Sequence, residues 1–121
     1  MTYPVPPDRL GETLRHFDSA TLITHELPYV KLLAVDPVMD GLELVVQEIR
    51  ASTRRNISAD PHVSLVWQQP THHGWTLIVD GVGEIEDDRV RVRAESAMLH
   101  RPRAHRDGPP LPPIEGIDGA V

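Results

Sequence analysis

The feature that most constrains the fold is a succession of short apolar segments that have the length of β-strands and end at turn residues. The segments expected to be strands are Ala20–Thr24, Tyr29–Val35, Leu42–Ile49, Val63–Trp67, Trp75–Ile85 and Arg89–Arg93. Asp40-Gly41 is a strong tight-turn signal and predicts a hairpin between the second and third of these. Successive hairpins predict a mainly β fold, a small β-barrel of about six antiparallel strands with short helices.

Two short helices are expected between the strands. Asp8 can cap the first, in which Leu10, Leu14 and Phe17 form a single apolar stripe. The second lies between the third and fourth strands and begins at Ser52, which is a good N-cap residue.

Other segments divide the chain into two regions. Residues 1–7 are rich in proline and should be extended, while residues 94–99 fit either a continued strand or a helical turn. The two glycines within 75–85 predict a bend or a β-bulge. Four prolines and few apolar groups predict a tail without core structure. We therefore expect a barrel domain over 1–102 and a Pro- and Gly-rich C-terminal tail over 103–121.

Composition excludes several classes of function. With 12 Lys and Arg against 18 Asp and Glu, the net charge is −6, so no broad basic face for nucleic acid can form. The absence of cysteine excludes disulfides and thiolate metal sites. No segment resembles a signal peptide or a membrane span, so we expect a cytoplasmic protein without a membrane partner. Hydrolytic residue sets are not recognisable, and the catalytic residues remain unknown.

The start of the second helix has the chemistry of an anion site. A helix N-terminus presents unpaired backbone N–H groups and a partial positive charge. Arg54 and Arg55 add guanidinium groups, and Ser52, Thr53 and Asn56 add neutral donors. Phosphate is the ligand that fits this set best. The alternative is a solvated basic turn, which composition alone favours because exposed arginine pairs are common.

Two further groups of residues receive less weight. His72 and His73 could bind a metal, but adjacent side chains should diverge and no carboxylate lies nearby in sequence, so we expect a solvated loop and no metal site. Arg89, Arg91 and Arg93 alternate with valine and could collect phosphates. A solvated strand edge that resists aggregation is the better interpretation of these three arginines.

Several blocks of the sequence resemble the pyridoxamine 5′-phosphate oxidase-like flavoproteins. The blocks are Thr21–Thr24, Thr53–Ile57, Asp60–Leu65, Ile78–Ile85 and Leu99–Pro102. The last block is similar to a short actinobacterial-type branch of the group. The resemblance implies an FMN-binding split β-barrel that forms a homodimer and binds its cofactor in grooves at the subunit interface. Some branches of the family bind a deazaflavin coenzyme instead of FMN, and haem-binding relatives also exist.

The resemblance also implies where a flavin would bind. The family's phosphate-binding position falls on Ser52, Arg54, Arg55 and Asn56, which agrees with the separate argument for an anion site. Contacts to the flavin ring would come from residues 35–38 and 63–67. Trp67 could stack on the ring, although its alternation with apolar neighbours favours core packing. His100 and Arg101 could reach an anionic cofactor held by the partner subunit, or could simply form a polar strand end.

Two departures from the family limit the function that the resemblance implies. The segment His25–Pro28 is shorter and poorer in glycine than the usual turn, and the chain lacks the C-terminal substrate-binding region of true pyridoxamine phosphate oxidases. We therefore expect a different activity, that of a small FMN-dependent oxidoreductase acting on a small-molecule substrate. The alternatives are a deazaflavin-dependent reductase and a non-catalytic dimer that binds flavin or haem. Surplus apolar surface on residues 29–35 and 75–85 predicts the two-fold interface.

Overall fold

The computed structural model describes residues 1–117 and is mainly β. The elements in chain order, with η marking a 3₁₀-helix, are β1 (Thr2–Pro4), η1 (Pro7–Arg9), α1 (Leu10–Leu14), β2 (Ala20–Glu26), β3 (Tyr29–Val35), β4 (Val38–Asp40), β5 (Glu43–Val46), α2 (Ala51–Ala59), β6 (His62–Gln68), β7 (Thr76–Glu86), β8 (Arg89–His100) and η2 (Arg103–His105). Among these residues no helix has the length and apolar character needed to cross a membrane.

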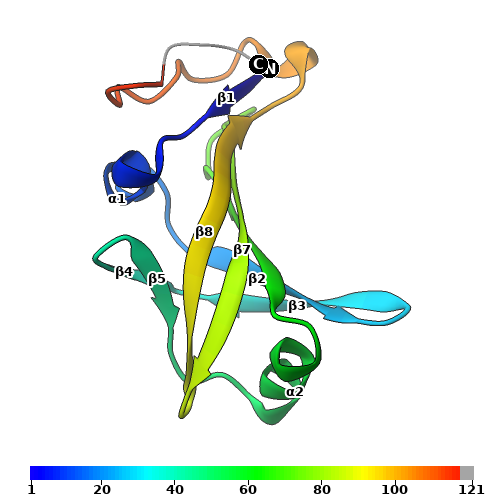
Figure 1. Ribbon diagram of the computed structural model, residues 1–121. Coiled ribbons are helices and arrows are strands. Elements are labelled where there is room, and N and C mark those ends of the chain that lie inside the picture. Colours follow the sequence, from blue (N-terminus) through cyan, green and yellow to red (C-terminus); the bar gives the residue numbers. More distant parts are fainter. Residues whose placement is uncertain (118–121) are drawn as a thin grey trace.

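The strands form one antiparallel sheet in the order β3-β2-β6-β7-β8-β5-β4, and β1 pairs with β8. Figure 1 shows that β7 and β8 are the long pair of the molecule and that β2 and β3 cross them. The predicted mainly β fold is confirmed. The sheet has eight strands rather than about six, because β1 and β4, of three residues each, have too little alternation to be recognised in the sequence.

The Asp40-Gly41 hairpin is present but joins different strands from those predicted. Gly41 has a φ of +65°, and Asp40 pairs with Glu43, so the turn connects β4 to β5. The strand before it, β3, pairs with β2 instead, in the register Ala20↔Val35 to Glu26↔Tyr29. The β2–β3 hairpin therefore projects from the sheet with one free edge (Figure 1).

A β-bulge divides the β7–β8 pair, as the glycines of β7 predict. Gly81 pairs with Ala94, whereas Asp80 pairs with Ser96, so Glu95 is an extra residue on β8. Gly81 is required there, since a Cβ on this residue would lie 2.4 Å from the carbonyl oxygen of Arg93. Residues 94–99, which fit either strand or helix by sequence, continue β8 as a strand.

Helix α2 packs one face on the sheet and begins earlier than expected. Thr53, Asn56 and Ile57 are its buried residues, at the i, i+3, i+4 spacing of one helix face. Arg50 occupies the N-cap position and Ser52 lies within the first turn, so the predicted Ser52 cap is wrong. Asp8 likewise lies inside η1 rather than capping a helix.

The core consists of side chains that point inward from five strands. Its largest fully buried strand residues are Leu22, Leu44, Val46, Leu65, Trp67, Leu77, Val79, Val90, Val92 and Leu99. These are the alternate residues of their strands, as period-two patterning requires. Full burial of a Leu or Val side chain stabilises a fold by about 1.5–3 kcal/mol. These residues therefore hold in place the strands that precede α2 in the chain and those that follow it.

The described part of the tail lacks strands but is not free of core contacts. Ile114 and Ile117 are buried and belong to the hydrophobic core, contrary to the expectation of a tail without core structure. Residues 118–121, which the predicted tail includes, lie outside the described residues.

Candidate functional site

The first turn of α2 carries the backbone donors of the predicted anion site. The N–H of Arg54 is bonded to the carbonyl of Arg50 at 3.0 Å, which closes the first turn. The N–H groups of Ala51, Ser52 and Thr53 precede that bond and have no acceptor within the helix. This turn therefore offers three backbone donors and the positive end of the helix dipole.

Lys31 adds a cation that the sequence analysis missed. Its Nζ lies 2.7 Å from the hydroxyl oxygen of Ser52 and donates a hydrogen bond to it. Lys31 is on β3 and pairs with Thr24 of β2, the strand against which α2 packs. Only the arrangement of β2, β3 and α2 brings Lys31 to the helix, so no local sequence signal could have identified it.

The two arginines of α2 have different surroundings. A terminal nitrogen of Arg54 donates to the backbone carbonyl of Asp87, in the turn between β7 and β8. Arg55 is exposed and makes no side-chain hydrogen bond or ion pair with residues 1–117. Arg54 thus fastens α2 to the β7–β8 turn, and Arg55 is available to a ligand.

Thr53 and Asn56 face the barrel rather than solvent. Asn56 Nδ2 donates to Thr24 Oγ1 at 3.2 Å and to Glu26 Oε2 at 3.4 Å. Both acceptors are on β2, and Asn56 and Thr24 are buried. The predicted phosphate donors therefore separate into an outward set, Ser52 and Arg55, and an inward set that holds the helix in place.

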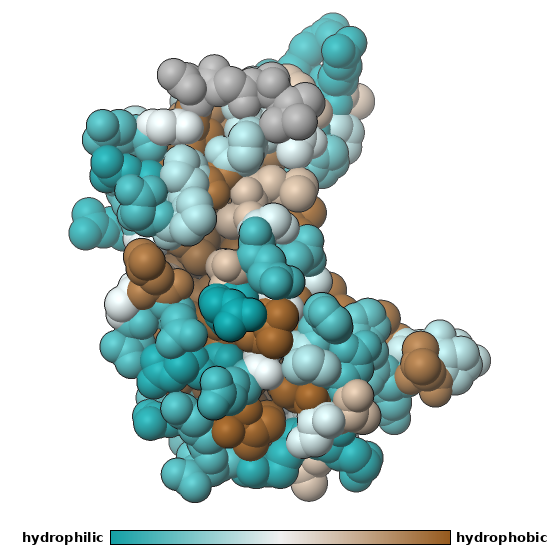
Figure 2. Space-filling view, viewed as in Figure 1, coloured by the Kyte–Doolittle hydropathy of each residue, from teal (hydrophilic) through white to brown (hydrophobic). Residues whose placement is uncertain are grey.

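An exposed apolar hairpin lies beside this turn. Leu27, Tyr29 and Leu32 are 88%, 76% and 62% exposed, which is unusual for large apolar side chains. Together with Glu26, Val30 and Lys31 they line a groove of about 540 Å³. Figure 2 shows apolar side chains on the projecting hairpin and a hollow between the hairpin and the opposite end of the molecule. The surplus apolar surface predicted for residues 29–35 is therefore present. Residues 75–85 were expected to show the same surplus, but the core-facing residues of β7 are buried.

The other predicted site residues lie away from α2. Trp67 is fully buried in the core, where its alternation in β6 places it. His100 ends β8, and its Nδ1 lies 2.9 Å from the hydroxyl oxygen of Thr2 on β1. Figure 1 shows this end of β8 on the opposite side of the molecule from α2. Within one chain, therefore, His100 and Arg101 do not meet the helix turn.

Arg101 is only 7% exposed and is engaged by its own chain. Its guanidinium carbon lies 4.0 Å from the ring centroid of Trp75, in cation–π geometry. One terminal nitrogen donates to the carbonyl of Pro109 at 2.7 Å and to that of His73 at 3.4 Å. The Nε atom is buried with no partner among the described residues.

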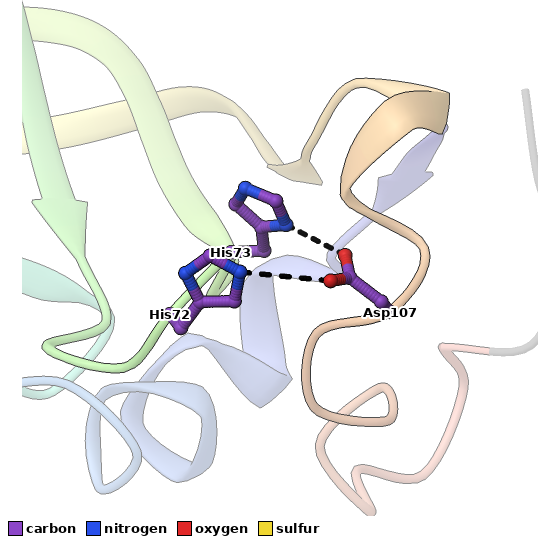
Figure 3. Close-up of side chains that lie close together, drawn as sticks. All are labelled: His72, His73 and Asp107. Atoms are coloured by element: carbon purple, nitrogen blue, oxygen red, sulfur yellow. Dashed lines mark hydrogen bonds and ion pairs between the residues drawn. The ribbon is translucent and has the colours of Figure 1, made fainter.

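His72 and His73 do not diverge as expected, and a carboxylate lies beside them. Their rings are stacked with centroids 3.7 Å apart. Asp107, distant in sequence, accepts a hydrogen bond from His73 Nδ1 at 2.6 Å, which lowers the pKa of the Asp107 carboxyl. Figure 3 shows both rings directed at this one carboxylate. Asp107 lies 34 residues beyond His73, so neighbours along the chain gave no indication of it.

The arginines of β8 are not on a sheet edge. β8 pairs with β7 on one side and with β5 on the other, so the predicted edge is wrong. Arg91 lies 2.9 Å from a carboxylate oxygen of Asp40 and 3.5 Å from one of Glu43. The hydrogen bond to Asp40 is the main cause of a raised pKa for the Arg91 guanidinium. Two of the three arginines are therefore engaged in ion pairs, Arg89 with Glu86 and Arg91 with Asp40 and Glu43.

Comparison with known proteins identifies relatives in sequence and in fold. No family model matches the chain. An uncharacterised protein of Mycobacterium bovis is 34% identical, with 79% of this chain and 80% of that protein covered. A FAD-binding protein of Mesorhizobium loti has a TM-score of 0.64 at 11% identity, covering 82% of this chain and 96% of that one.

Two further solved structures share the fold. A putative pyridoxamine 5′-phosphate oxidase of Corynebacterium glutamicum has a TM-score of 0.62 at 10% identity, with 84% of this chain and 99% of that one covered. An F420 reductase has a TM-score of 0.58 at 19% identity, with 79% and 98% covered. The chain is therefore a homologue of the mycobacterial protein, and it has the split β-barrel fold of the flavin-binding and pyridoxamine 5′-phosphate oxidase-like structures.

Proposed function

We propose that the chain is a homodimeric FMN-binding protein and a small flavin-dependent oxidoreductase, distinct from the true pyridoxamine phosphate oxidases. The observation that carries the proposal is the contact of Lys31 Nζ with Ser52 Oγ, at 2.7 Å, on the first turn of α2. This contact brings the Lys31 ammonium group to the turn that carries the three backbone donors. A second cation on the same helix, Arg55, has no partner among residues 1–117.

The phosphate of FMN is the part of the ligand for which this turn is suited. Backbone N–H groups and the helix dipole favour an anion, and an Arg guanidinium binds phosphate oxygens through two parallel hydrogen bonds. In the proposed site Arg55 and Lys31 neutralise the phosphate, and Ser52 orients it. Asn56 and Arg54 hold α2 in the position that makes this possible.

The exposed hairpin is the part of the chain that a second subunit would cover. FMN supplies the hydride-transfer chemistry when bound, and the protein supplies binding and exclusion of water. Leu27, Tyr29 and Leu32 are apolar groups that a second copy of the chain would cover, and a two-fold dimer is the commonest closed assembly. We expect Leu32→Asp to dissociate the dimer, because it places a charge in the covered apolar surface, and light scattering would measure the change in mass. A wild-type chain that is monomeric at micromolar concentration would contradict this arrangement.

Replacement of Arg55 by Ala tests the phosphate assignment. Hydrogen bonds to charged groups contribute about 1.5–3 kcal/mol, so FMN affinity should fall about ten- to a hundredfold. Riboflavin lacks the phosphate, and its weaker binding should hardly change. The measurement is titration of FMN and riboflavin by flavin fluorescence. Arg15→Ala, which removes an exposed arginine outside α2, is the matched control and should leave both affinities unchanged.

Each other outcome of the titration has a definite meaning. An equal loss for FMN and riboflavin in Arg55→Ala would place Arg55 at the ring or in the structure rather than at the phosphate. Unchanged binding of both ligands would return the cluster to a solvated basic turn. Either result would refute the proposed phosphate site.

A deazaflavin-dependent reductase is the second candidate function, favoured by the likeness to an F420 reductase. A longer acidic coenzyme tail needs further cations near Arg55, and Lys31 and Arg50 supply two. The absorption spectrum of the protein as purified, followed by parallel titrations with FMN and the deazaflavin coenzyme, separates the two candidates. Tighter binding of the deazaflavin coenzyme would favour the reductase.

A further inference from the structure

A cluster of metal-ligating side chains lies at the end of the molecule that carries the tail. His72 and His73 come from the loop between β6 and β7, and Asp107 comes from the turn after η2 (Figure 3). His73 Nδ1 lies 2.6 Å from one carboxylate oxygen of Asp107, and His72 Nε2 lies 3.5 Å from the other. One ligand atom from each residue lies within 4.8 Å of the other two. The cluster is therefore compact enough for one small ion.

The ligand types and their separations suit a transition metal. Imidazole nitrogen and carboxylate oxygen are ordinary ligands of Zn²⁺, which binds them at about 2.0–2.2 Å in tetrahedral geometry, so neighbouring ligand atoms lie about 3.3 Å apart. The observed separations lie on both sides of this value. Three protein ligands would leave the fourth position of a tetrahedral ion to water.

The backbone holds the histidine loop and the tail turn together. His73 has a φ of +53°, in the left-handed region that non-glycine residues seldom adopt, and this backbone conformation sets the direction of its side chain. Gly108 approaches so closely that a Cβ on it would lie 2.1 Å from the carbonyl oxygen of His73. Arg101 bridges the same two segments through the carbonyls of His73 and Pro109. The two halves of the cluster are thus fixed relative to each other without an ion.

The ring of His73 lies between two other imidazoles. Its centroid is 3.7 Å from that of His72 and 3.8 Å from that of His105, and the ring planes of His73 and His105 differ by only 1°. Groups that fix the orientation of a ligating histidine strengthen metal sites. His105 stacks on His73 without belonging to the cluster, in which two imidazoles meet one carboxylate.

We propose that His72, His73 and Asp107 form a binding site for a divalent transition-metal ion, with Zn²⁺ the best match. The ion fastens the tail to the loop between β6 and β7. The cluster comes from other elements than the start of α2, so the proposal does not depend on flavin binding.

Calorimetric titration of Zn²⁺ into untagged, chelator-treated protein near neutral pH tests the site. We expect one ion per chain and a Zn²⁺-dependent rise in the melting temperature. Asp107→Asn should weaken binding at least about tenfold, because even changes to groups behind the ligands weaken metal binding about 10–100-fold. His72→Ala should do the same, and its exposed side chain makes loss of the fold an inadequate explanation.

The matched control is His62→Ala. His62 and Asp60 form another exposed His–Asp pair, with Nδ1 and Oδ1 at 2.8 Å, but within residues 1–117 this pair belongs to no cluster of three metal-ligating side chains. This variant should bind Zn²⁺ as the wild type does. The proposal is overturned if the wild type does not bind Zn²⁺, if Asp107→Asn binds it unchanged, if His62→Ala weakens it equally, or if one ion is shared between two chains.

Discussion

Replacing Asn56 by Ala should destabilise the cofactor-free chain, because this side chain holds α2 on β2. Its Nδ2 donates to Thr24 Oγ1 at 3.2 Å and to Glu26 Oε2 at 3.4 Å. Asn56 and Thr24 are buried, so water does not readily replace the lost partner. A buried polar group left unsatisfied costs about 1–3 kcal/mol. We expect the free energy of unfolding to fall by about that amount.

Asn56→Asp keeps the size of the side chain but places a negative charge beside Glu26. Two unit charges at the observed 3.4 Å repel by about 1 kcal/mol in water and by about 5 kcal/mol at an effective dielectric constant of 20. The Asp variant also loses the two donors of the amide. It should therefore be at least as unstable as the Ala variant.

Urea denaturation followed by circular dichroism, without flavin, measures these changes. Thr24→Val completes a double-mutant cycle, in which we expect a coupling of about 0.5–3 kcal/mol with Asn56→Ala. Arg55→Ala changes an exposed side chain of the same helix and should stay within about 0.5 kcal/mol of the wild type. An Asn56→Ala chain as stable as Arg55→Ala would refute the structural role of this amide.

Two further predictions concern the barrel and its surface. Gly81→Ala should lower the free energy of unfolding by about 1–3 kcal/mol, because its Cβ would meet the Arg93 carbonyl oxygen at 2.4 Å. Gly11→Ala, in helix α1 with its nearest contact at 3.7 Å, should instead raise the free energy of unfolding by about 0.5–1 kcal/mol. Urea denaturation curves that show no difference between the two variants would contradict this. The hydrogen bond from the His62 side chain lowers the pKa of the Asp60 carboxyl from its usual 3.8. The ionised carboxylate therefore stabilises the fold fully above pH 3.8, and this stabilisation is lost as the pH falls through the lower pKa of the folded state. The stability advantage of wild type over Asp60→Asn should accordingly shrink below pH 3.8 in acid-denaturation curves, and a constant difference would be inconsistent with it.

The strands that alternate regularly between turns could be predicted from sequence. Residues 29–35 form β3 as expected, because Leu27-Pro28 interrupts the chain before a regular alternation. The pairing of β3 with β2, rather than with the next strand, was not predictable in the same way. Val38–Asp40 is only three residues long, so β4 and its role in the Asp40-Gly41 hairpin had no pattern to indicate them.

The second half of β8 shows why alternation alone can fail. Val90 and Val92 are buried, and then Ala97 and Leu99, so the buried positions change from even to odd numbers. The extra residue at the bulge, Glu95, causes this change of phase. The sequence contains both halves of the pattern, but only the pairing with β7 shows that they belong to one strand.

The proposed anion site divides in a similar way between what is local and what is not. Ser52, Arg54 and Arg55 are neighbours in sequence, so their proximity was predictable. Their separate roles depend on which face of α2 meets β2 and on where the β7–β8 turn lies. Lys31 reaches the same turn only through the pairing of β2 with β3.

The tail illustrates a limit of composition as a guide to structure. Prolines lack a backbone N–H and were expected to prevent regular pairing, which is consistent with the absence of strands in residues 101–117. Each proline still has a carbonyl that can accept a hydrogen bond. Those of Pro109 and Pro110 accept from the indole N–H of buried Trp75, and that of Pro109 also accepts from buried Arg101. A segment rich in acceptors and poor in donors thus accepts hydrogen bonds from two side chains that can only donate, and these bonds, together with the burial of Ile114 and Ile117, explain why the tail lies against the barrel.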